Sequence, residues 1–366
     1  MRRIEARGIG VVGSMVLLVT VGFLLPTSSA LGGSLRPAAA PSAVKIHAWT
    51  QLTYTSGTPP SARESFGMAY DPDLKAAVLF GGIDASGRPL SDTWLYSHGH
   101  WKNVTATSGT GPAARWYPGL VFDPQLNGTL LFGGQNYYTS ICGASCAFND
   151  TWLFNSTGWH NISSALAPPP QAGPGLVYDT HDGYVVLYGR PAAAGGYSDF
   201  WVYNGGKWTN VTAKITGAAI PSLAFTTIVD DAAAGYVVLY GGTAGCSGAG
   251  ITYDLRNLQL HNLSAYPPDA RMGSRAAAYD AALKGVVLTG GYDANCNVVP
   301  ATWMFKGGHW QNITAFTGTA IPGRWDGRMV WDSALGTHGA DLVFGGDEYP
   351  TGGYGSLGSD TWKLAP

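Results

Sequence analysis

The sequence predicts an all-β fold, a ring of six four-stranded antiparallel sheets that together form a β-propeller. Three observations predict it: an apolar strand ending in glycine recurs six times, an aspartate precedes each copy, and tryptophans follow at constant spacing. The 366 residues include 52 glycines and 12% aromatic residues, which suits many turns around a packed core and excludes a disordered chain. A formal net charge of −2 gives no basic excess, so nucleic acid is not an expected partner.

The glycine-ended strands lie about 50 residues apart, which indicates repeated supersecondary units around a shared core. They occupy residues 78–82, 130–134, 186–190, 238–242, 287–291 and 342–346. Before each strand, an aspartate is expected to open a short turn, because its side chain can bond the backbone two residues on. These aspartates are Asp71, Asp123, Asp179, Asp230, Asp280 and Asp332.

After a variable loop, each repeat continues with a strand centred on a tryptophan, and a second tryptophan follows before an Asn-Val/Ile-Thr/Ser strand. The first position holds Trp94, Trp152, Trp201, Trp303 and Trp362, and the second holds Trp101, Trp159, Trp208 and Trp310. In the fourth repeat we expect Ile251 and Leu260 at the two positions. Each repeat therefore predicts four short strands joined by tight turns.

The double glycine after an apolar strand, followed by tryptophans at two fixed distances, resembles the kelch repeat. The resemblance covers residues 45–366 and implies a single domain, a six-bladed kelch-type β-propeller. The last repeat lacks its outer strand, whereas residues 47–53 form an unmatched outer strand. We expect this N-terminal strand to complete the last blade, which would close the ring and protect an exposed edge.

Residues 1–30 are expected to form an export signal. A positively charged start precedes an uncharged apolar stretch over residues 8–25, and small residues form a cleavage site ending at Ala30. The alternative is an uncleaved membrane anchor, for which the apolar stretch is short. Residues 31–44, rich in Ser, Ala, Pro and Gly, are expected to be a flexible spacer. Either alternative predicts a propeller that is secreted or held extracellularly at the cell surface.

The propeller assigns every connection to one of two faces. With strands numbered outward from the axis, the 2–3 and 4–1 connections share one face, and the 1–2 and 3–4 connections share the other. The longest 2–3 connections lie between Gly134 and Asp150 and between Gly346 and Asp360. Variable loops on a rigid scaffold commonly carry binding specificity. We therefore expect a non-catalytic binding scaffold that uses the 2–3/4–1 face.

Arginines beside aromatic residues mark the candidate ligand-binding arc on blades one, two and six. The candidate residues are Arg63, Arg115, Trp116, Tyr137, Tyr138, Arg324 and Trp325. Guanidinium groups beside aromatic faces suit carboxylates, sugars or extended peptides. The alternative is that each arginine belongs to the repeat and braces the neighbouring blade. The expected partner is a protein, peptide or glycan, and the chain is expected to be a monomer.

All four cysteines fall in 2–3 connections. An even number in an exported protein favours disulfides, and we predict Cys142–Cys146 and Cys246–Cys296, the second joining neighbouring blades. The alternative is four free or buried thiols. A zinc site is disfavoured because no histidine shares this face.

Eight Asn-x-Ser/Thr sequons are candidate glycosylation sites. They are Asn103, Asn127, Asn149, Asn155, Asn161, Asn210, Asn262 and Asn312. Five belong to the repeated outer strand, where exposed Asn and Thr need no sugar to explain them. Glycosylation therefore depends on the source organism.

Catalytic, metal-binding and cofactor-binding residues are not predicted. Some kelch-like propellers are copper-radical oxidases resembling galactose oxidase, but none of the eight histidines falls in a 2–3 or 4–1 connection. No phosphate-binding glycine motif precedes a helix. The remaining enzyme alternative is a secreted carbohydrate-active hydrolase that uses paired carboxylates at the channel mouth. The candidate carboxylates are Glu64, Asp84, Asp326, Asp347 and Glu348.

Overall fold

A computed structural model describes residues 47–365 except 55–56, 138–145, 193–197, 224, 242–249, 265–275, 294, 296 and 349–355. The described residues belong to a compact unit, Lys45–Pro366. In this part of the chain, no helix has the length and apolar character needed to cross a membrane.

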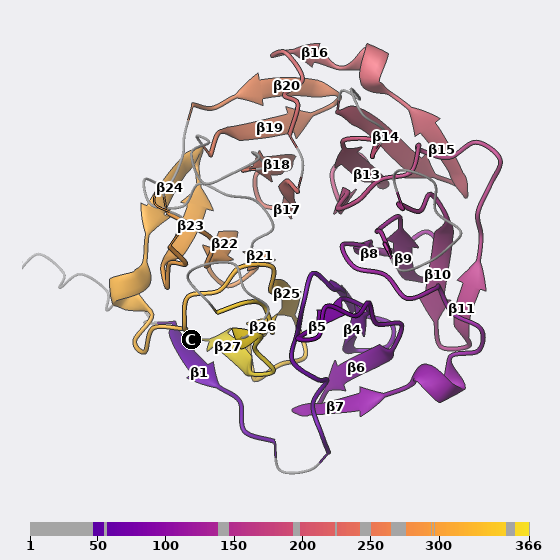
Figure 1. Ribbon diagram of the computed structural model, residues 1–366. Helices are drawn as coiled ribbons and strands as arrows, with labels where there is room; N and C mark the ends of the chain where they lie inside the picture. The colour runs from indigo at the N-terminus through magenta and orange to yellow at the C-terminus, as the bar shows by residue number, and fades with distance from the viewer. Residues whose placement is uncertain are drawn as a thin grey trace, which may run out of the picture. The chain divides into compact units, whose positions relative to one another are not determined.

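Six four-stranded antiparallel sheets stand around a central axis as the blades of a propeller (Figure 1). From the axis outward, blade one contains β3 (Gly67–Asp71), β4 (Ala76–Phe80), β6 (Thr93–Ser97) and β7 (His100–Asn103). Blade two contains β8 (Gly119–Asp123), β9 (Gly128–Phe132), β10 (Thr151–Asn155) and β11 (Gly158–Asn161). Blade three contains β12 (Gly175–Asp179), β13 (Tyr184–Gly189), β14 (Asp199–Asn204) and β15 (Lys207–Asn210).

The second half of the ring repeats this order. Blade four contains β17 (Thr227–Asp231), β18 (Tyr236–Tyr240), β19 (Thr252–Arg256) and β20 (Gln259–Asn262). Blade five contains β21 (Ala276–Asp280), β22 (Gly285–Thr289), β23 (Thr302–Lys306) and β24 (His309–Asn312). Blade six contains β25 (Arg328–Asp332), β26 (Ala340–Phe344), β27 (Thr361–Ala365) and β1 (Ala48–Gln51). The prediction of an all-β, six-bladed propeller is confirmed.

Blade six combines strands from distant parts of the sequence. Its outer strand β1 pairs antiparallel with β27, from Ala48 opposite Ala365 to Gln51 opposite Trp362. Figure 1 shows the indigo β1 beside the yellow β27.

Short elements in the connections complete the fold. β2 (Arg63–Glu64) pairs antiparallel with β5 (Ile83–Asp84), which joins the segment before blade one to the 2–3 connection of that blade. β16 (Thr216–Gly217) adds a parallel fifth strand outside β20. Three 3₁₀ turns follow outer strands: η1 (Thr105–Thr107), η2 (Thr212–Lys214) and η3 (Thr314–Phe316).

Strand register in blade four differs from the expectation. Asp231 lies opposite Tyr236, as Asp71 lies opposite Ala76 in blade one, so Asp231 and not Asp230 opens the turn. Tyr253 lies opposite Leu239, as Trp94 lies opposite Leu79, so Tyr253 and not Ile251 takes the first tryptophan position. The sequence alignment was wrong here because two aspartates are adjacent and the tryptophan is absent.

Glycine pairs after the second strand allow neighbouring blades to approach closely. Gly81 and Gly82 have φ of +70° and +98°, and Gly82 N–H donates to the Arg115 carbonyl oxygen at 3.0 Å. A Cβ at Gly81 would lie 2.6 Å from the same oxygen. Other side chains would therefore be strained in φ and would clash with the next blade.

The hydrophobic core lies between blades and is built largely from the second and third strands. Each core cluster contains residues of two adjacent blades, as where Phe66 of blade one meets Phe344 of blade six at 5.6 Å between ring centroids. At five interfaces an outer-strand indole N–H donates to a threonine of the preceding blade at 2.9–3.0 Å. The pairs are Trp49–Thr302, Trp101–Thr361, Trp159–Thr93, Trp208–Thr151 and Trp310–Thr252. These tryptophans therefore contribute apolar burial and a directional bond between blades.

Candidate ligand-binding site at the axis

The three candidate arginines form buried clamps within their own blades. Arg115 is fully buried and donates from Nη1 and Nη2 to the two carboxylate oxygens of Asp150, at 2.6 and 2.8 Å. Nη1 also donates to the Gly133 carbonyl oxygen at 2.9 Å. The equivalent clamps join Arg63 to Asp92 and Arg324 to Asp360.

The clamps leave these guanidinium groups turned away from solvent. Burial alone would raise the pKa of Asp150, but the hydrogen bonds and charge of Arg115 hold that pKa below its ordinary value. The aspartate therefore stays ionised and paired. Because Arg63, Arg115 and Arg324 are each paired with an aspartate of their own blade, these guanidinium groups are already engaged in structural contacts. Their bracing acts within the blade, whereas the Arg115 backbone carbonyl contacts the neighbouring blade.

Aromatic side chains of the predicted set lie on the 2–3/4–1 face. Trp116 is almost buried and packs edge-to-face against Tyr137, with ring centroids 5.5 Å apart. Tyr137 is 56% exposed, so it is the accessible part of this pair. Trp325 of blade six packs against Tyr292 of blade five at 5.3 Å. Tyr138 lies outside the described residues.

A second set of residues, of which the sequence singled out only Asp326, meets across the axis. It occupies the position six residues before the turn aspartate, and its described members have positive φ. The described members are Ser65, Tyr117, Gly173, Phe225 and Asp326, with φ of +57°, +51°, +70°, +57° and +54°. Left-handed backbone at non-glycine residues is uncommon and clusters at functional sites.

These axial residues contact one another. Asp326 Oδ2 accepts hydrogen bonds from Tyr117 OH at 2.5 Å and from Ser65 Oγ at 3.1 Å. The Tyr117 ring packs against Phe225, with centroids 4.7 Å apart. Gly173 lies between them in the ring order, and a Cβ there would lie 2.5 Å from the Phe225 ring. Glycine in blade three therefore permits a contact between blades two and four.

Glu64, Asp326 and Asp347, here called the axial acidic group, are buried at the same end of the channel. These residues are only 3%, 0% and 1% exposed, respectively. Burial, and then the charges of Asp326 and Asp347, raises the pKa of Glu64 to about 9, while Arg328 acts in the opposite direction. Glu64 therefore carries a proton at neutral pH. Its Oε2 has no hydrogen-bond partner within the described part of the chain.

Tyrosines around the axial acidic group respond to the same charges. Burial and Asp326 raise the pKa of Tyr117 well above its ordinary value. Burial, followed by Asp347 and Asp326, likewise raises the pKa of Tyr292. Both phenols therefore stay protonated and can donate hydrogen bonds.

The structure brings together three of the five predicted carboxylates. Asp84 instead accepts hydrogen bonds from the exposed Arg88, and Glu348 lies 3.3 Å from Arg324 Nη2. The sequence signal for the missed residues Ser65 and Tyr117 is their fixed distance from the turn aspartate.

Cysteines and sequons have local roles where they are described. Cys146 is disulfide-bonded, and the other three cysteines lie outside the described residues. At the outer-strand sequons, the asparagine Oδ1 accepts the backbone N–H two residues on, as in Asn103 to Thr105 at 3.0 Å. The same bond occurs at Asn161, Asn210, Asn262 and Asn312. These residues thus close a turn after the outer strand.

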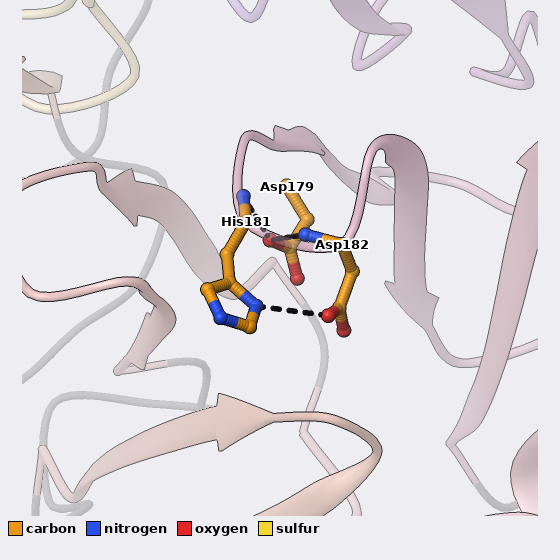
Figure 2. A group of neighbouring side chains, drawn as sticks. All are labelled: Asp179, His181 and Asp182. Carbon is orange, nitrogen blue, oxygen red and sulfur yellow. Dashed lines mark hydrogen bonds and ion pairs between the residues drawn. The ribbon is translucent and has the colours of Figure 1, made fainter.

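Asp179, His181 and Asp182 form a compact group on the opposite face (Figure 2). Asp179 Oδ1 accepts the backbone N–H groups of His181 and Asp182, both at 3.0 Å. His181 Nδ1 lies 2.9 Å from Asp182 Oδ1. The group is the blade-three version of the repeated aspartate turn, and we assign it no metal.

The fold and the axial arrangement define a kelch-type propeller with an acidic centre on its 2–3/4–1 face. Residues 42–242 match the family model described as the KLHDC2/KLHL20/DRC7 Kelch-repeats domain, and the chain belongs to this kelch-repeat family. The solved structure of YjhT is similar, with a TM-score of 0.58 over 85% of this chain and 99% of that chain. At 14% identity this likeness concerns the fold alone. A search of the curated proteins finds no match.

Proposed function

We propose that this propeller is an extracellular, non-catalytic binding protein that engages its ligand through the 2–3/4–1 face. The carrying observation is the axial acidic group, which interrupts the repetition of the ring. Glu64 directly follows the clamp arginine of blade one. In the other two described blades with a clamp, the residue at this position is a tryptophan, Trp116 or Trp325. Three buried carboxylates are costly to keep out of water, and such perturbed groups cluster at functional sites.

The ligand is proposed to be a protein, peptide or glycan segment that supplies hydrogen-bond donors. Glu64 Oε2 lacks a partner among the described side chains, so a ligand group that donates to or accepts from this protonated carboxyl group would offset its desolvation. Tyr137, which packs against Trp116, would provide an exposed aromatic surface on the same face.

Export and covalent modification belong to the same proposal. The charged and apolar pattern of residues 1–30 supports an extracellular location. We propose the pairings Cys142–Cys146 and Cys246–Cys296, which would stabilise loops of the binding face. Glycosylation of the eight sequons is proposed only for a host that modifies them, and a monomer is the proposed state.

A glycan and peptide array probed with the purified full-length protein tests this function. We expect saturable binding without turnover, weakened about tenfold by Glu64→Gln or Asp326→Asn because a buried partner is altered. The matched control is Arg88→Ala, which removes an exposed ion pair on the same face. Binding that none of these variants changes, or an array with no ligand, would contradict the proposal.

A second candidate, a carbohydrate-active hydrolase, rests on one observation. The high pKa of Glu64 beside Asp326 and Asp347 places a protonated carboxyl next to acidic neighbours, an arrangement that glycoside hydrolysis uses. Fluorogenic glycosides would distinguish the candidates. Turnover that is lost in Glu64→Gln while ligand binding remains would favour the hydrolase.

A further inference from the structure

A cavity lies on the axis. Its volume is about 570 Å³, within the size range of small-molecule sites. One end is lined by Tyr117, Phe225 and Arg328, and the other reaches the 1–2 turns at Pro72 and Pro124. The cavity therefore extends toward the face opposite the proposed binding face.

Aromatic side chains surround the end of this cavity near the 1–2 turns. They occupy the last inner-strand position before the turn aspartate, and each is partly exposed. The five are Tyr70, Phe122, Tyr178, Tyr279 and Trp331, all of which line the cavity. We call them the aromatic rim. Their faces and edges supply apolar surface and π electrons to whatever occupies the cavity.

The sixth blade position, in blade four, carries Asp230 instead of an aromatic residue. The strand register establishes this equivalence, because Asp231 opens the blade-four turn. Asp230 also lines the cavity and is only 9% exposed. The rim is therefore five aromatic rings and one carboxyl group.

One of the two oxygens of the Asp230 carboxyl group has a hydrogen-bond partner. Its Oδ2 accepts a hydrogen bond from Thr180 Oγ1 at 2.6 Å, whereas its Oδ1 is buried and has no partner among the described residues. Burial and the nearby Asp179 raise its pKa to about 6, against the effect of the Thr180 hydrogen bond. At neutral pH the group is thus mostly ionised. A cation held beside the carboxyl group would compensate its negative charge.

The charges on the cavity wall favour a cation over an anion. Arg328, at the far end, already interacts with the charge of Asp326, which opposes the lowering of the Arg328 pKa by burial. Three rim residues are tyrosines, whose hydroxyl groups could also bind a neutral sugar, but a neutral ligand would leave the charge of Asp230 uncompensated. Aromatic faces around a carboxylate suit an alkylated ammonium group, whose weak hydration lowers its cost of burial.

We infer that the axial cavity binds a small organic ammonium ion that enters between the 1–2 turns. Its cationic head lies against Asp230, and its apolar body packs on the aromatic rim. This site differs from the binding face of the proposed function. It lies on the side of Tyr117 and Phe225 that faces the 1–2 turns, and Glu64, Asp326 and Asp347 do not line it.

Calorimetric titration of the full-length protein with benzyltrimethylammonium tests the inference. We expect saturable binding, and about tenfold weaker binding of the uncharged isostere neopentylbenzene, because the isostere lacks the charge. Asp230→Asn should also weaken benzyltrimethylammonium binding about tenfold while keeping an acceptor for Thr180. Thermal unfolding of this variant checks that it is folded.

Two control variants separate this site from other charges. Asp182→Asn removes a carboxylate near the same face that does not line the cavity, and it should leave binding unchanged. Glu64→Gln should also leave it unchanged, whereas it should weaken array binding on the other face. Equal affinity for the charged and uncharged probes, no saturable binding, or no effect of Asp230→Asn would overturn the inference.

Discussion

The interface between blades three and four differs from the other five interfaces of the ring. Elsewhere, an outer-strand indole donates to a threonine of the preceding blade, as Trp159 does to Thr93 at 2.9 Å. Here Leu260 replaces the tryptophan and Phe200 replaces the threonine, and both belong to one hydrophobic cluster. Because donor and acceptor are replaced together, neither is left buried and unpaired.

Backbone pairing on the outer strand is more extensive at this interface than at two others, where Trp159 N–H donates to the Ser108 carbonyl oxygen and Trp49 N–H to the Thr317 carbonyl oxygen, each at 2.9 Å. β16 adds to the outside of β20, with Thr216 N–H donating to the Leu258 carbonyl oxygen at 3.0 Å. Ala218 N–H donates to the Leu260 carbonyl oxygen at 2.7 Å. Additional backbone bonds therefore accompany the loss of the side-chain bond at this interface.

The arginine clamp is exchanged as a pair in blade four but not in blade three. In blade four, Leu223 occupies the arginine position and Ile251 the aspartate position, so both charges are absent. In blade three, Gln171 stands where the clamp arginine would be, while Asp199 keeps the aspartate position. The comparison teaches that the interface between blades three and four exchanges its buried donor and acceptor together, and that a single residue of a clamp is a poor guide to function.

Breaking a clamp should have the largest effect. Arg115→Ala leaves Asp150 without its buried partner, and we expect a loss of about 3 kcal/mol in the free energy of unfolding. The double variant Arg115→Leu/Asp150→Ile, which imports the blade-four pair, should recover part of this loss. Urea unfolding measures both. If the single variant loses no more than Arg88→Ala, the clamp is not a stabilising contact.

The pH dependence of stability should reveal the axial acidic group. The pKa of Glu64 is raised to about 9 by folding, so the folded protein retains a proton that the unfolded chain releases above its ordinary pKa. Stability should therefore fall as pH rises between about 5 and 9, with a magnitude that neighbouring carboxyls share because they titrate together. Glu64→Gln should flatten this fall in pH-dependent urea unfolding. Parallel curves for wild type and variant would show that Glu64 is ionised when folded.

The glycine pairs provide a test of the close approach between blades. Gly81→Ala introduces both positive-φ strain and a contact with the Arg115 carbonyl oxygen, and should cost about 2 kcal/mol. Gly99→Ala is matched, because its φ is +83° and a Cβ there meets nothing within 4 Å. We expect Gly99→Ala to cost about 1 kcal/mol in the same thermal unfolding experiment. Equal losses of stability in the two variants would mean that the neighbouring blade shifts to accommodate the added methyl group at position 81.

The tryptophan–threonine bond should have the smallest effect. Thr93→Val keeps the side-chain shape but leaves the Trp159 indole N–H unpaired, which should cost about 1 kcal/mol. Phe200→Tyr, at the equivalent position of blade three, has no facing indole and serves as the contrast. Chemical denaturation of both variants would test whether the threonine position matters only where a tryptophan faces it.

Repetition made most of the fold predictable from the sequence. Glycine pairs, turn aspartates and tryptophans recur at nearly constant spacing, so the number of blades follows from their count. The prediction was wrong where a landmark was replaced, as at Tyr253, because strand pairing and not residue type sets the register.

The site was less predictable because burial depends on contacts distant in sequence. By residue type alone, Arg115 could bind a ligand or brace the fold. Its side chain is turned inward because it pairs with Asp150, 35 positions away in the sequence. Glu64, Asp326 and Asp347 could be placed at the channel mouth from strand order. Tyr117 and Phe225 could not be singled out, since their contact depends on Gly173 in a third blade.

The pairing of β1 with β27 has a consequence for the order of folding. Ala48 and Ala365 are the most distant paired residues in the described sequence, so their contact carries the greatest loop-closure entropy. We expect blades one to five to assemble from nearly local contacts while the ring is still open. The β1–β27 ladder is then expected to form late. A pulling force applied through these two strands would act on the hydrogen bonds of this ladder before it acts on any other blade.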